Sequence, residues 1–176
     1  MFFIESERLK LLALEHHQLL LLLENQSLLE QSLGLNPANL EVYFGDNFMK
    51  EFEEAMQAVT IPMVAQYPEH YKWLTFWLIV HKKDNLYMGG IGAFGFPVKH
   101  DSETMVGYFI DQKYERQGFA TEALARLLEW MFAEPALKTV VADTPSEHFA
   151  SQKVLQKNGF VYDKEVEEGI HWRLTK

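Results

Sequence analysis

Apolar residues follow helical and strand-like periods in alternation along the chain. The clearest helical period lies between residues 118 and 134, where the apolar positions are Ala120, Ala123, Leu124, Leu127, Leu128 and Met131. We predict further helices over residues 15–33, as two short helices that stop at Gly34, over 47–59 and over 144–158. We predict strands over residues 4–14, 73–81, 86–96, 104–110, 138–142, 160–165 and 170–174. No repeat and no linker interrupts this order, so we expect a single domain, residues 1–176.

Capping residues indicate where two of these helices begin and end. Asp46 is placed to cap the helix that follows it. Thr144, Pro145 and Glu147 predict a capping box, with Thr144 as the N-cap and Pro145 in the first turn, where its missing N–H costs nothing. We expect the same helix to stop at Gly159.

The composition is that of a globular protein. Hydrophobic residues make up 48% of the 176 residues and aromatic residues 14%, which suffices for a sizeable core. The first residues, 1–8, lack the basic and then apolar order of a secretory signal. The longest apolar runs, residues 19–23 and 73–80, fall short of the about 18 residues that a membrane span needs. We therefore expect a soluble protein of the cytoplasm with no membrane partner.

The charge and the absence of cysteine exclude several classes of chemistry. Lys and Arg number 16 against 25 Asp and Glu, a formal net charge of −9, which argues against nucleic acid as a partner. The chain has no Cys, which removes disulfides, thiolate metal sites and Cys nucleophiles. His16, His17 and His70 have no carboxylate at ligand spacing on a defined helix face, so we interpret them as solvated and expect no metal.

The loop before the long helix contains the residues of an anion site. Gly118 and Ala120 are small, so the backbone at this junction can approach a ligand closely. A helix start leaves about four N–H groups unpaired and carries a partial positive charge, which suits phosphate. Lys113 and Arg116 add basic side chains nearby. On these residues alone a plainer interpretation stays open, in which Gly118 only forms a tight turn before a core helix.

Three separated segments carry family signatures. Residues 115–120 read Glu-Arg-Gln-Gly-Phe-Ala and are followed by Thr-Glu-Ala. Residues 154–160 read Val-Leu-Gln-Lys-Asn-Gly-Phe, and residues 4–11 read Ile-Glu-Ser-Glu-Arg-Leu-Lys-Leu. In this order the segments resemble the GNAT superfamily of acyl-CoA-dependent N-acetyltransferases, whose signatures are Gln/Arg-x-x-Gly-x-Gly/Ala at a helix start and a later helix ending in Lys-x-Gly-Phe. The opening segment is similar to the branch that contains the ribosomal-protein-alanine acetyltransferases.

The resemblance implies a fold and a cofactor. The fold is α/β (α+β), a mixed and mainly antiparallel sheet of six to seven strands flanked by helices. The cofactor is acetyl-CoA, used as a co-substrate, with its pantetheine along a strand at Phe109, Ile110 and Asp111. The residues that the resemblance places at the pyrophosphate are Arg116, Gln117, Gly118, Phe119, Ala120 and Thr121. It also places Ser151 near the CoA sulfur.

Amine acetylation needs a base that takes a proton from the ammonium and an acid that returns one to the thiolate. The related branch has Glu where this chain has Met105, so Glu103, two residues back on the same strand face, is the candidate base, acting through a water. Ser151 and His148 are the candidate acids, His148 because an imidazole titrates near neutral pH. Two alternatives stay open: Glu103 as a solvated strand end, and Ser151 as an ordinary helix residue. Tyr108 is expected to pack against the site or line it.

The resemblance predicts an enzyme, an N-acetyltransferase that moves acetyl from acetyl-CoA to a primary amine by direct attack in a ternary complex. The amine is a small molecule or a peptide N-terminus. The alternative is a non-catalytic acyl-CoA-binding module of the same fold, because Met105 and Glu115 depart from the family pattern. The excess of acid favours a cationic acceptor, and residues 15–60 are expected to shape its pocket. A monomer and a homodimer are both compatible with the sequence.

Overall fold

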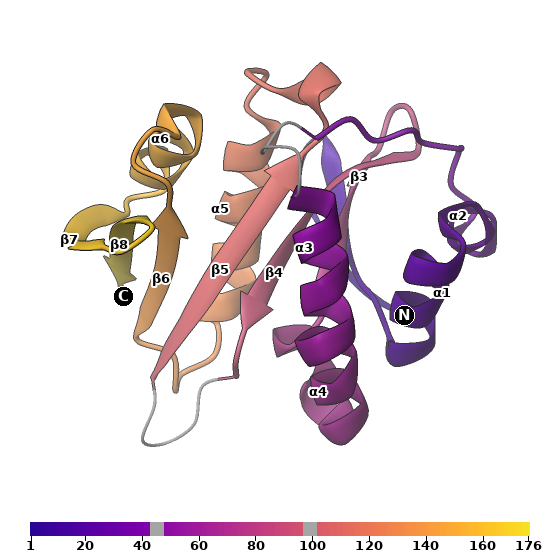
Figure 1. Cartoon of the computed structure of the whole chain (residues 1–176), viewed down its shortest axis with the longest axis horizontal. Helices are drawn as coiled ribbons and strands as arrows, with labels where there is room; N and C mark the ends of the chain where they lie inside the picture. Colours follow the sequence, from indigo (N-terminus) through magenta and orange to yellow (C-terminus); the bar gives the residue numbers. More distant parts are fainter. Residues whose placement is uncertain (43–47, 97–101) are drawn as a thin grey trace.

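One twisted sheet forms the centre of the molecule. The computed structural model describes residues 1–42, 48–96 and 102–176 (Figure 1). The strand order is β1-β2-β3-β4-β5-β6-β8-β7, and every neighbouring pair is antiparallel except β5 and β6. The strands are β1 (Phe2–Glu5), β2 (Leu9–Ala13), β3 (Phe76–His81), β4 (Leu86–Phe94), β5 (Glu103–Ile110), β6 (Thr139–Thr144), β7 (Val161–Val166) and β8 (Gly169–Thr175). This mixed, mainly antiparallel sheet confirms the expected fold class.

The sheet has eight strands rather than the expected six to seven, because the opening segment forms two strands and not one. Residues 4–14 contain a turn at Ser6, whose backbone N–H donates to the carbonyl of Leu9 at 3.0 Å. The Ser6 hydroxyl accepts the Leu9 N–H at 3.2 Å. This turn reverses the chain between β1 and β2, so the predicted strand is divided at the turn, and β1 begins at Phe2, before the predicted segment.

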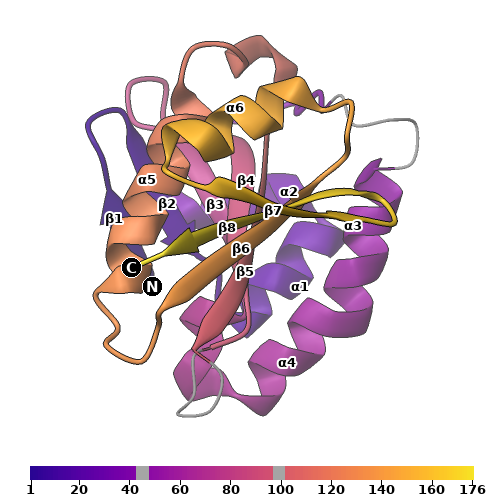
Figure 2. The ribbon, with the colours of Figure 1, turned by 90° about the vertical axis from the view of Figure 1, so that its left-hand side faces the viewer.

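Helices cover both faces of the sheet (Figure 2). One face carries α1 (His16–Glu24), α2 (Gln26–Leu33), α3 (Phe48–Ala55) and α4 (Ile61–Gln66), with the π-helical turn η1 (Met56–Thr60) joining the last two. The other face carries α5 (Phe119–Phe132), and α6 (Phe149–Lys157) packs against α5. Two short 3-10 turns complete the described elements, η2 (Pro68–Trp73) and η3 (Gln112–Tyr114).

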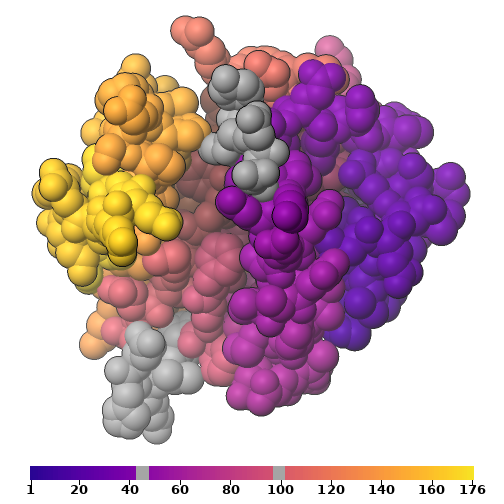
Figure 3. All heavy atoms as spheres, in the orientation of Figure 1, coloured from indigo at the N-terminus to yellow at the C-terminus, as the bar shows by residue number. Residues whose placement is uncertain are grey.

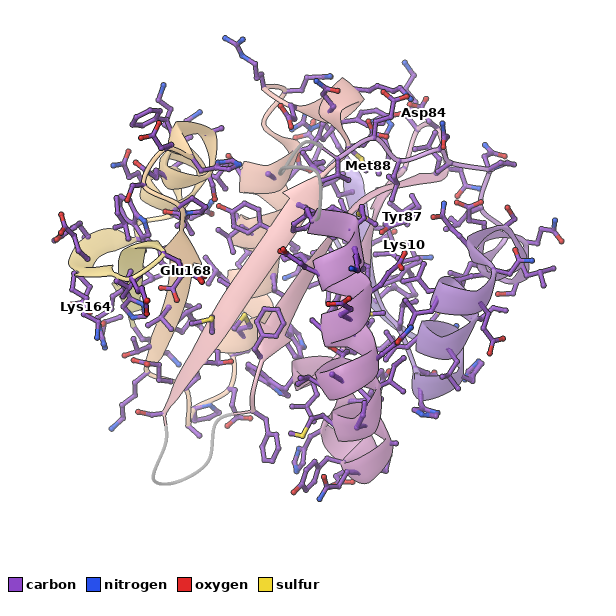
Figure 4. All side chains as sticks on the ribbon, in the orientation of Figure 1. Lys10, Asp84, Tyr87, Met88, Lys164 and Glu168 are labelled. Atoms are coloured by element: carbon purple, nitrogen blue, oxygen red, sulfur yellow. The ribbon has the colours of Figure 1, made fainter. Side chains whose placement is uncertain are left out.

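The sheet therefore separates two apolar cores. Neighbouring residues of β4, Tyr87 and Met88, belong to different cores because successive strand side chains point to opposite faces (Figure 4). Burial raises the pKa of the Tyr87 hydroxyl, with the Glu30 carboxylate adding to the effect. The core on the α5 side contains Ala123, Leu124, Leu127 and Met131 at 0% exposure, which confirms the apolar stripe of the long helix.

One predicted helix end agrees with the structure, and one helix end and one strand start differ from it. The stop at Gly34 is confirmed, since this residue is the C-cap of α2 with a φ of 69°. The third helix continues past residue 59, through η1 and α4, because Pro62 lies in the first turn of α4, where an N–H is not needed. Asp46, the expected cap of this helix, lies outside the described residues. In the second difference, the strand expected from residue 73 begins at Phe76, because η2 occupies the residues before it.

The predicted capping box at the start of α6 is wrong. Thr144 is the last residue of β6, and its hydroxyl accepts the indole N–H of Trp172 at 2.9 Å. The N-cap is instead His148, whose Nδ1 accepts the backbone N–H of Ser151 at 3.0 Å. The helix end near Gly159 is confirmed, with a φ of 85° at that glycine.

The parallel pair β5 and β6 separates along its length. The two strands are paired only between Glu103–Met105 and Thr139–Val141. Beyond these residues they diverge, and Figure 1 shows a V-shaped opening at their carboxyl ends. Within the described residues, no helix is both long enough and apolar enough to cross a membrane.

Candidate active site

The first cavity lies at the start of α5 and has a volume of about 540 Å³, a size typical of small-ligand sites. We call it the helix-start cavity. It is lined by Tyr108, Phe109, Ile110, Tyr114, Glu115, Arg116, Gly118, Phe119, Ala120, Thr121, His148, Ala150, Ser151, Lys153, Val154 and Lys157. Three of these side chains are cationic and one is a carboxylate, so the cavity as a whole favours an anion.

The backbone at the start of α5 allows a ligand to approach closely. Gly118 is the N-cap of α5 with a φ of 83°, a conformation that residues with a side chain rarely adopt. Arg116 also has a positive φ, of 60°. Because Gly118 has no side chain to cap the helix, the first-turn N–H groups are left for water or a ligand. Together with the positive end of the helix dipole, they make an anion-binding concavity.

A set of interactions from the N-terminal hairpin holds this helix start in place. The Glu122 carboxylate accepts from the Ser6 hydroxyl at 2.7 Å, from the Arg8 backbone N–H at 2.8 Å and from Arg8 Nε at 2.6 Å. Arg8 also donates to the carbonyl of Gln117 at 3.1 Å, and its guanidinium lies 4.1 Å from the centre of the Phe119 ring. Partial burial by itself raises the pKa of Glu122. These hydrogen bonds and the Arg8 charge lower it by more than burial raises it, so the pKa is below its ordinary value.

The second cavity lies between α3, the middle of the sheet and the end of β6, and measures ≈ 420 Å³. We call it the aromatic cavity. Five phenylalanines line it, and four of them pack ring to ring: the centroids are 4.9 Å apart for Phe52 and Phe76, 5.3 Å for Phe52 and Phe109, and 5.4 Å for Phe48 and Phe109. Gly90 makes room for this wall, because a Cβ at that position would lie 1.7 Å from the Phe76 ring. Figure 3 shows the hollow between α3 and the segment of α6, β7 and β8.

The charge of the aromatic cavity is opposite to that of the helix-start cavity. Its lining includes the carboxylates of Glu51, on α3, and Asp143, on β6, and among the residues that the structure describes it includes no Lys or Arg. Both carboxylates are solvent-exposed, so they are accessible from the cavity mouth. An apolar wall with carboxylates suits a ligand that joins an apolar body to a cation.

The two cavities meet at four residues, Tyr108, Phe109, His148 and Ser151, which line both. The Tyr108 hydroxyl lies 2.9 Å from the Ser151 hydroxyl and donates to the Ser151 carbonyl at 3.1 Å. Burial raises the pKa of Tyr108 to about 12, although its hydrogen bond with Ser151 lowers it slightly. Tyr108 therefore remains protonated at neutral pH, and the pair can donate a proton at the point where the cavities join.

Most of the residues predicted for the cofactor gather at the helix-start cavity. Phe109, Ile110, Arg116, Gly118, Phe119, Ala120, Thr121 and Ser151 line it. Asp111 does not: it is buried at 3% exposure, and its carboxylate accepts the backbone N–H groups of Lys113 and Glu41. Gln117 does not line it either, because its side-chain amide donates to the carbonyl of Lys113 at 2.8 Å.

The three predicted catalytic residues are not brought together. Ser151 and His148 lie at the junction of the cavities, and the cap bond to Ser151 occupies Nδ1 of His148, so a proton exchanged by the neutral ring passes through Nε2. Glu103 lines neither cavity. Its carboxylate forms an ion pair with Arg173 at 3.1 Å, at the start of β5, where this strand is still paired with β6.

Four charged residues of the cavities are absent from the sequence prediction. Lys153 and Lys157 lie one helical turn apart on α6, a spacing that the sequence does contain. Glu51 and Asp143 have no such local signal, because they reach the aromatic cavity from elements far apart in the chain. Among the residues that the structure describes, no group of three or more His, Cys, Asp or Glu is placed to hold a metal ion.

Comparison with solved structures places this fold among acetyltransferases. The ribosomal-protein-S5-alanine acetyltransferase from Vibrio fischeri superposes with a TM-score of 0.67 at 17% identity, covering 99% of this chain and 97% of that one. The ribosomal L7/L12 alpha-N-protein acetyltransferase RimL, solved in complex with coenzyme A, also has a TM-score of 0.67, at 16% identity, covering 99% and 98% of the two chains.

The family follows from the sequence match. Residues 35–161 match the model of the acetyltransferase (GNAT) domain, and the chain belongs to this family. The uncharacterized N-acetyltransferase YjdG of Bacillus subtilis (strain 168) is 28% identical over 96 residues, 54% of this chain and 56% of YjdG. YoaA, an uncharacterized N-acetyltransferase of the same organism, is 28% identical over 118 residues, 67% of this chain and 64% of YoaA. The matches thus span less than two thirds of these relatives.

Proposed function

We propose that this GNAT-family acetyltransferase transfers an acetyl group from acetyl-CoA to a primary amine, by direct attack of the amine on the thioester in a ternary complex. The observation that carries the proposal is the junction of two cavities of opposite charge at Tyr108, Phe109, His148 and Ser151. One cavity suits a phosphate-bearing donor and the other a cationic acceptor, and a group bound in each would meet at this junction.

The residues of the helix-start cavity fit acetyl-CoA. The first-turn N–H groups after Gly118 receive the pyrophosphate, and Arg116, Lys153 and Lys157 supply positive charge around the nucleotide. The end of β5 at Phe109 and Ile110, which pairs with β4 but no longer with β6, offers the backbone groups of its free edge to the pantetheine amides, as to an added strand. The likeness to RimL, which was solved with coenzyme A, supports this arrangement.

The junction supplies the acid. The thiolate that leaves after attack receives a proton from the Ser151 hydroxyl, which is replenished by the Tyr108 hydroxyl 2.9 Å away. His148, which lines both cavities, is the alternative donor through Nε2. The ion pair of Glu103 with Arg173, and its absence from both linings, favour a role for Glu103 in joining β5 to β8 rather than in catalysis.

The acceptor is a primary amine that is protonated in solution, either a small molecule or a peptide N-terminus. Glu51 and Asp143 attract its ammonium group, and the phenylalanine wall contacts its apolar part. This view sharpens the expectation from the net charge of −9. The carboxylates that face the acceptor lie in one cavity, beside an apolar wall. This combination favours a monoamine with an apolar body over a polyamine.

Two measurements test the proposal. Isothermal titration is expected to show acetyl-CoA binding, and the release of CoA thiol is expected to rise above background when primary amines are added. No binding at millimolar acetyl-CoA would refute the proposal. Binding without thiol release, across amines with apolar and polar bodies, would support instead the acyl-CoA-binding module.

A further inference from the structure

The proposed reaction also needs a base, which takes a proton from the ammonium. Glu103 lines neither cavity, whereas the carboxylates of Glu51 and Asp143 line the aromatic cavity. Asp143 is the next-to-last residue of β6, beyond the last residue of that strand that pairs with β5. It lines the aromatic cavity together with the junction residues Tyr108, His148 and Ser151.

Asp143 is held by a histidine from the neighbouring strand. His171 of β8 lies directly opposite Asp143 in the antiparallel pair, and its Nδ1 is 2.5 Å from Asp143 Oδ1. A carboxylate oxygen can only accept, so Nδ1 of His171 carries the proton. The His171 side chain is 12% exposed and the Asp143 side chain 46%, so the histidine is largely buried whereas the carboxylate is accessible to solvent.

We propose that Asp143, oriented by His171, is the catalytic base for the acceptor amine. This inference rests on the proposed function. One oxygen of the carboxylate is engaged by His171, which leaves Oδ2 to receive the ammonium. His171 is a positioning residue: it fixes the direction of the carboxylate and takes no part in the transfer of acetyl.

Asp143 takes one proton from the ammonium and passes it to solvent, and the nitrogen lone pair attacks the thioester carbonyl carbon. The C–N bond forms, the C–S bond breaks, and the sulfur leaves with the electron pair as a thiolate. The nitrogen loses its second proton to solvent, and the thiolate gains one proton from solvent through the Ser151 hydroxyl. The products are the amide, CoA thiol and one proton.

Charged and titratable groups from several elements lie around the Asp143–His171 pair. Glu51 faces the same cavity from α3, and His148 and Tyr108 do so from the junction. Lys164 of β7 is the register partner of His171, on the hairpin that also carries Glu168 at its turn (Figure 4). Arg173 lies two residues along β8 and is engaged by Glu103 and Asp163.

The main test compares Asp143→Asn with a matched control, Asp163→Asn. Asp163 is a carboxylate on the same half of the sheet, 33% exposed, that lines neither cavity. With 2-phenylethylamine as acceptor and saturating acetyl-CoA, Asp143→Asn is expected to lower kcat by about 100-fold, the lower end of what a general base contributes. The Kd for acetyl-CoA and the melting temperature are expected to stay at the wild-type values, and Asp163→Asn is expected to keep the wild-type kcat.

Three further arms of the experiment distinguish a base from a residue that only binds the amine or supports the structure. Phenylalaninamide has the same aromatic body, but its α-amine titrates near 8 whereas an alkylamine titrates near 10. At pH 8 the loss in Asp143→Asn is therefore expected to be smaller for phenylalaninamide. Asp143→Ala is expected to regain activity when formate is added. His171→Phe is expected to lower kcat with little change in KM, and His171→Asn, which keeps a donor near the Nδ1 position, is expected to recover part of it.

Three results would overturn the proposal. They are an equal kcat for Asp143→Asn and Asp163→Asn, a loss confined to KM, and a loss in Glu103→Gln as large as that in Asp143→Asn. The failure of the proposed function is seen separately, in the wild type: if it binds acetyl-CoA and releases no CoA with either amine, the proposed function and this inference are both wrong.

Discussion

The helix-start cavity and the aromatic cavity share four residues and differ in almost everything else. The first has Arg116, Lys153 and Lys157 in its lining, and the second has Glu51 and Asp143 and, within residues 1–42, 48–96 and 102–176, no Lys or Arg. A protein with a formal net charge of −9 thus has a cationic and an anionic region within one hollow. Net charge describes the surface as a whole, whereas binding depends on the few groups that face the ligand.

The two cavities also differ in which part of the chain makes them. The helix-start cavity depends on backbone conformation, with positive φ at Arg116 and Gly118 and with first-turn N–H groups as donors. The aromatic cavity depends on side chains, namely a phenylalanine wall and two carboxylates. A backbone site tolerates side-chain exchange and fails when its glycine is replaced, and a side-chain site should behave in the opposite way.

The largest effect is expected from Gly118→Val. Valine disfavours the φ of 83° at this position, so the first turn of α5 shifts and its N–H groups no longer converge on the pyrophosphate. The loss of one or two hydrogen bonds to a charged phosphate, each worth roughly 1.5–3 kcal/mol, corresponds to acetyl-CoA binding about 100-fold weaker. Isothermal titration measures the change.

The control for this prediction is Gly34→Val. Gly34 also has a positive φ, of 69°, but it is the C-cap of α2 and lines neither cavity. Both variants are expected to lose thermal stability, and only Gly118→Val is expected to lose acetyl-CoA affinity. Equal affinities in the two variants would contradict a backbone site at the start of α5.

A smaller effect, confined to the other cavity, is expected from Glu51→Lys. Reversing an exposed charge beside a cationic acceptor costs on the order of 1 kcal/mol, so the KM for 2-phenylethylamine is expected to rise about 5- to 10-fold. The rise should shrink at high salt, because exposed charges are screened. Steady-state kinetics at two ionic strengths measure both effects, and the Kd for acetyl-CoA is expected not to change.

Glu53→Lys provides the matched control for Glu51→Lys. Glu53 is exposed on the same helix and does not line the cavity. If both substitutions raise KM equally, the effect comes from the overall charge of α3 and not from a carboxylate at the cavity.

The sequence predicts one of these cavities far better than the other. The start of α5 is encoded locally: a strand, a short polar loop, Gly118 and a long apolar stripe follow one another within thirty residues or so, and the structure confirms the stripe and the helix start. The sequence also contains Lys153 and Lys157 at helical spacing, so the amphipathic pattern of α6 predicts that these two side chains share one face of the helix.

The aromatic cavity is encoded by contacts between distant segments. Asp143 and His171 are 28 residues apart and meet only through the register of β6 and β8. The capping error at α6 has a related cause. Thr144 reads locally as an N-cap, but its hydroxyl is taken by Trp172 from β8, and the longer strand leaves His148 as the cap. Tertiary partners decide which local option a residue takes, and a single sequence does not contain them.

The smallest effect on ligand binding is expected from Glu122→Gln, which tests the contacts that hold the start of α5, and with it the helix-start cavity, in place. Glu122 ties the first turn of α5 to the N-terminal hairpin through Ser6 and Arg8. Its pKa is lowered in the folded protein, so the stability that its charge contributes is present above its unfolded pKa and is lost as the pH falls through the folded value.

Glu122→Gln is therefore expected to be less stable than the wild type by about 1–2 kcal/mol near neutral pH, in line with a hydrogen bond to a charged group. The difference should narrow as the pH falls below about 4.5, the ordinary pKa of this side chain, because the wild-type carboxyl also becomes neutral. Urea unfolding at pH 7 and pH 3.5 measures it. Glu129→Gln, on the exposed side of the same helix with a carboxylate 70% exposed, is expected to change stability by less than about 0.5 kcal/mol at both pH values. A constant difference across pH would mean that Glu122 acts through packing rather than through its charge, and the link between the hairpin and the helix-start cavity would then be steric.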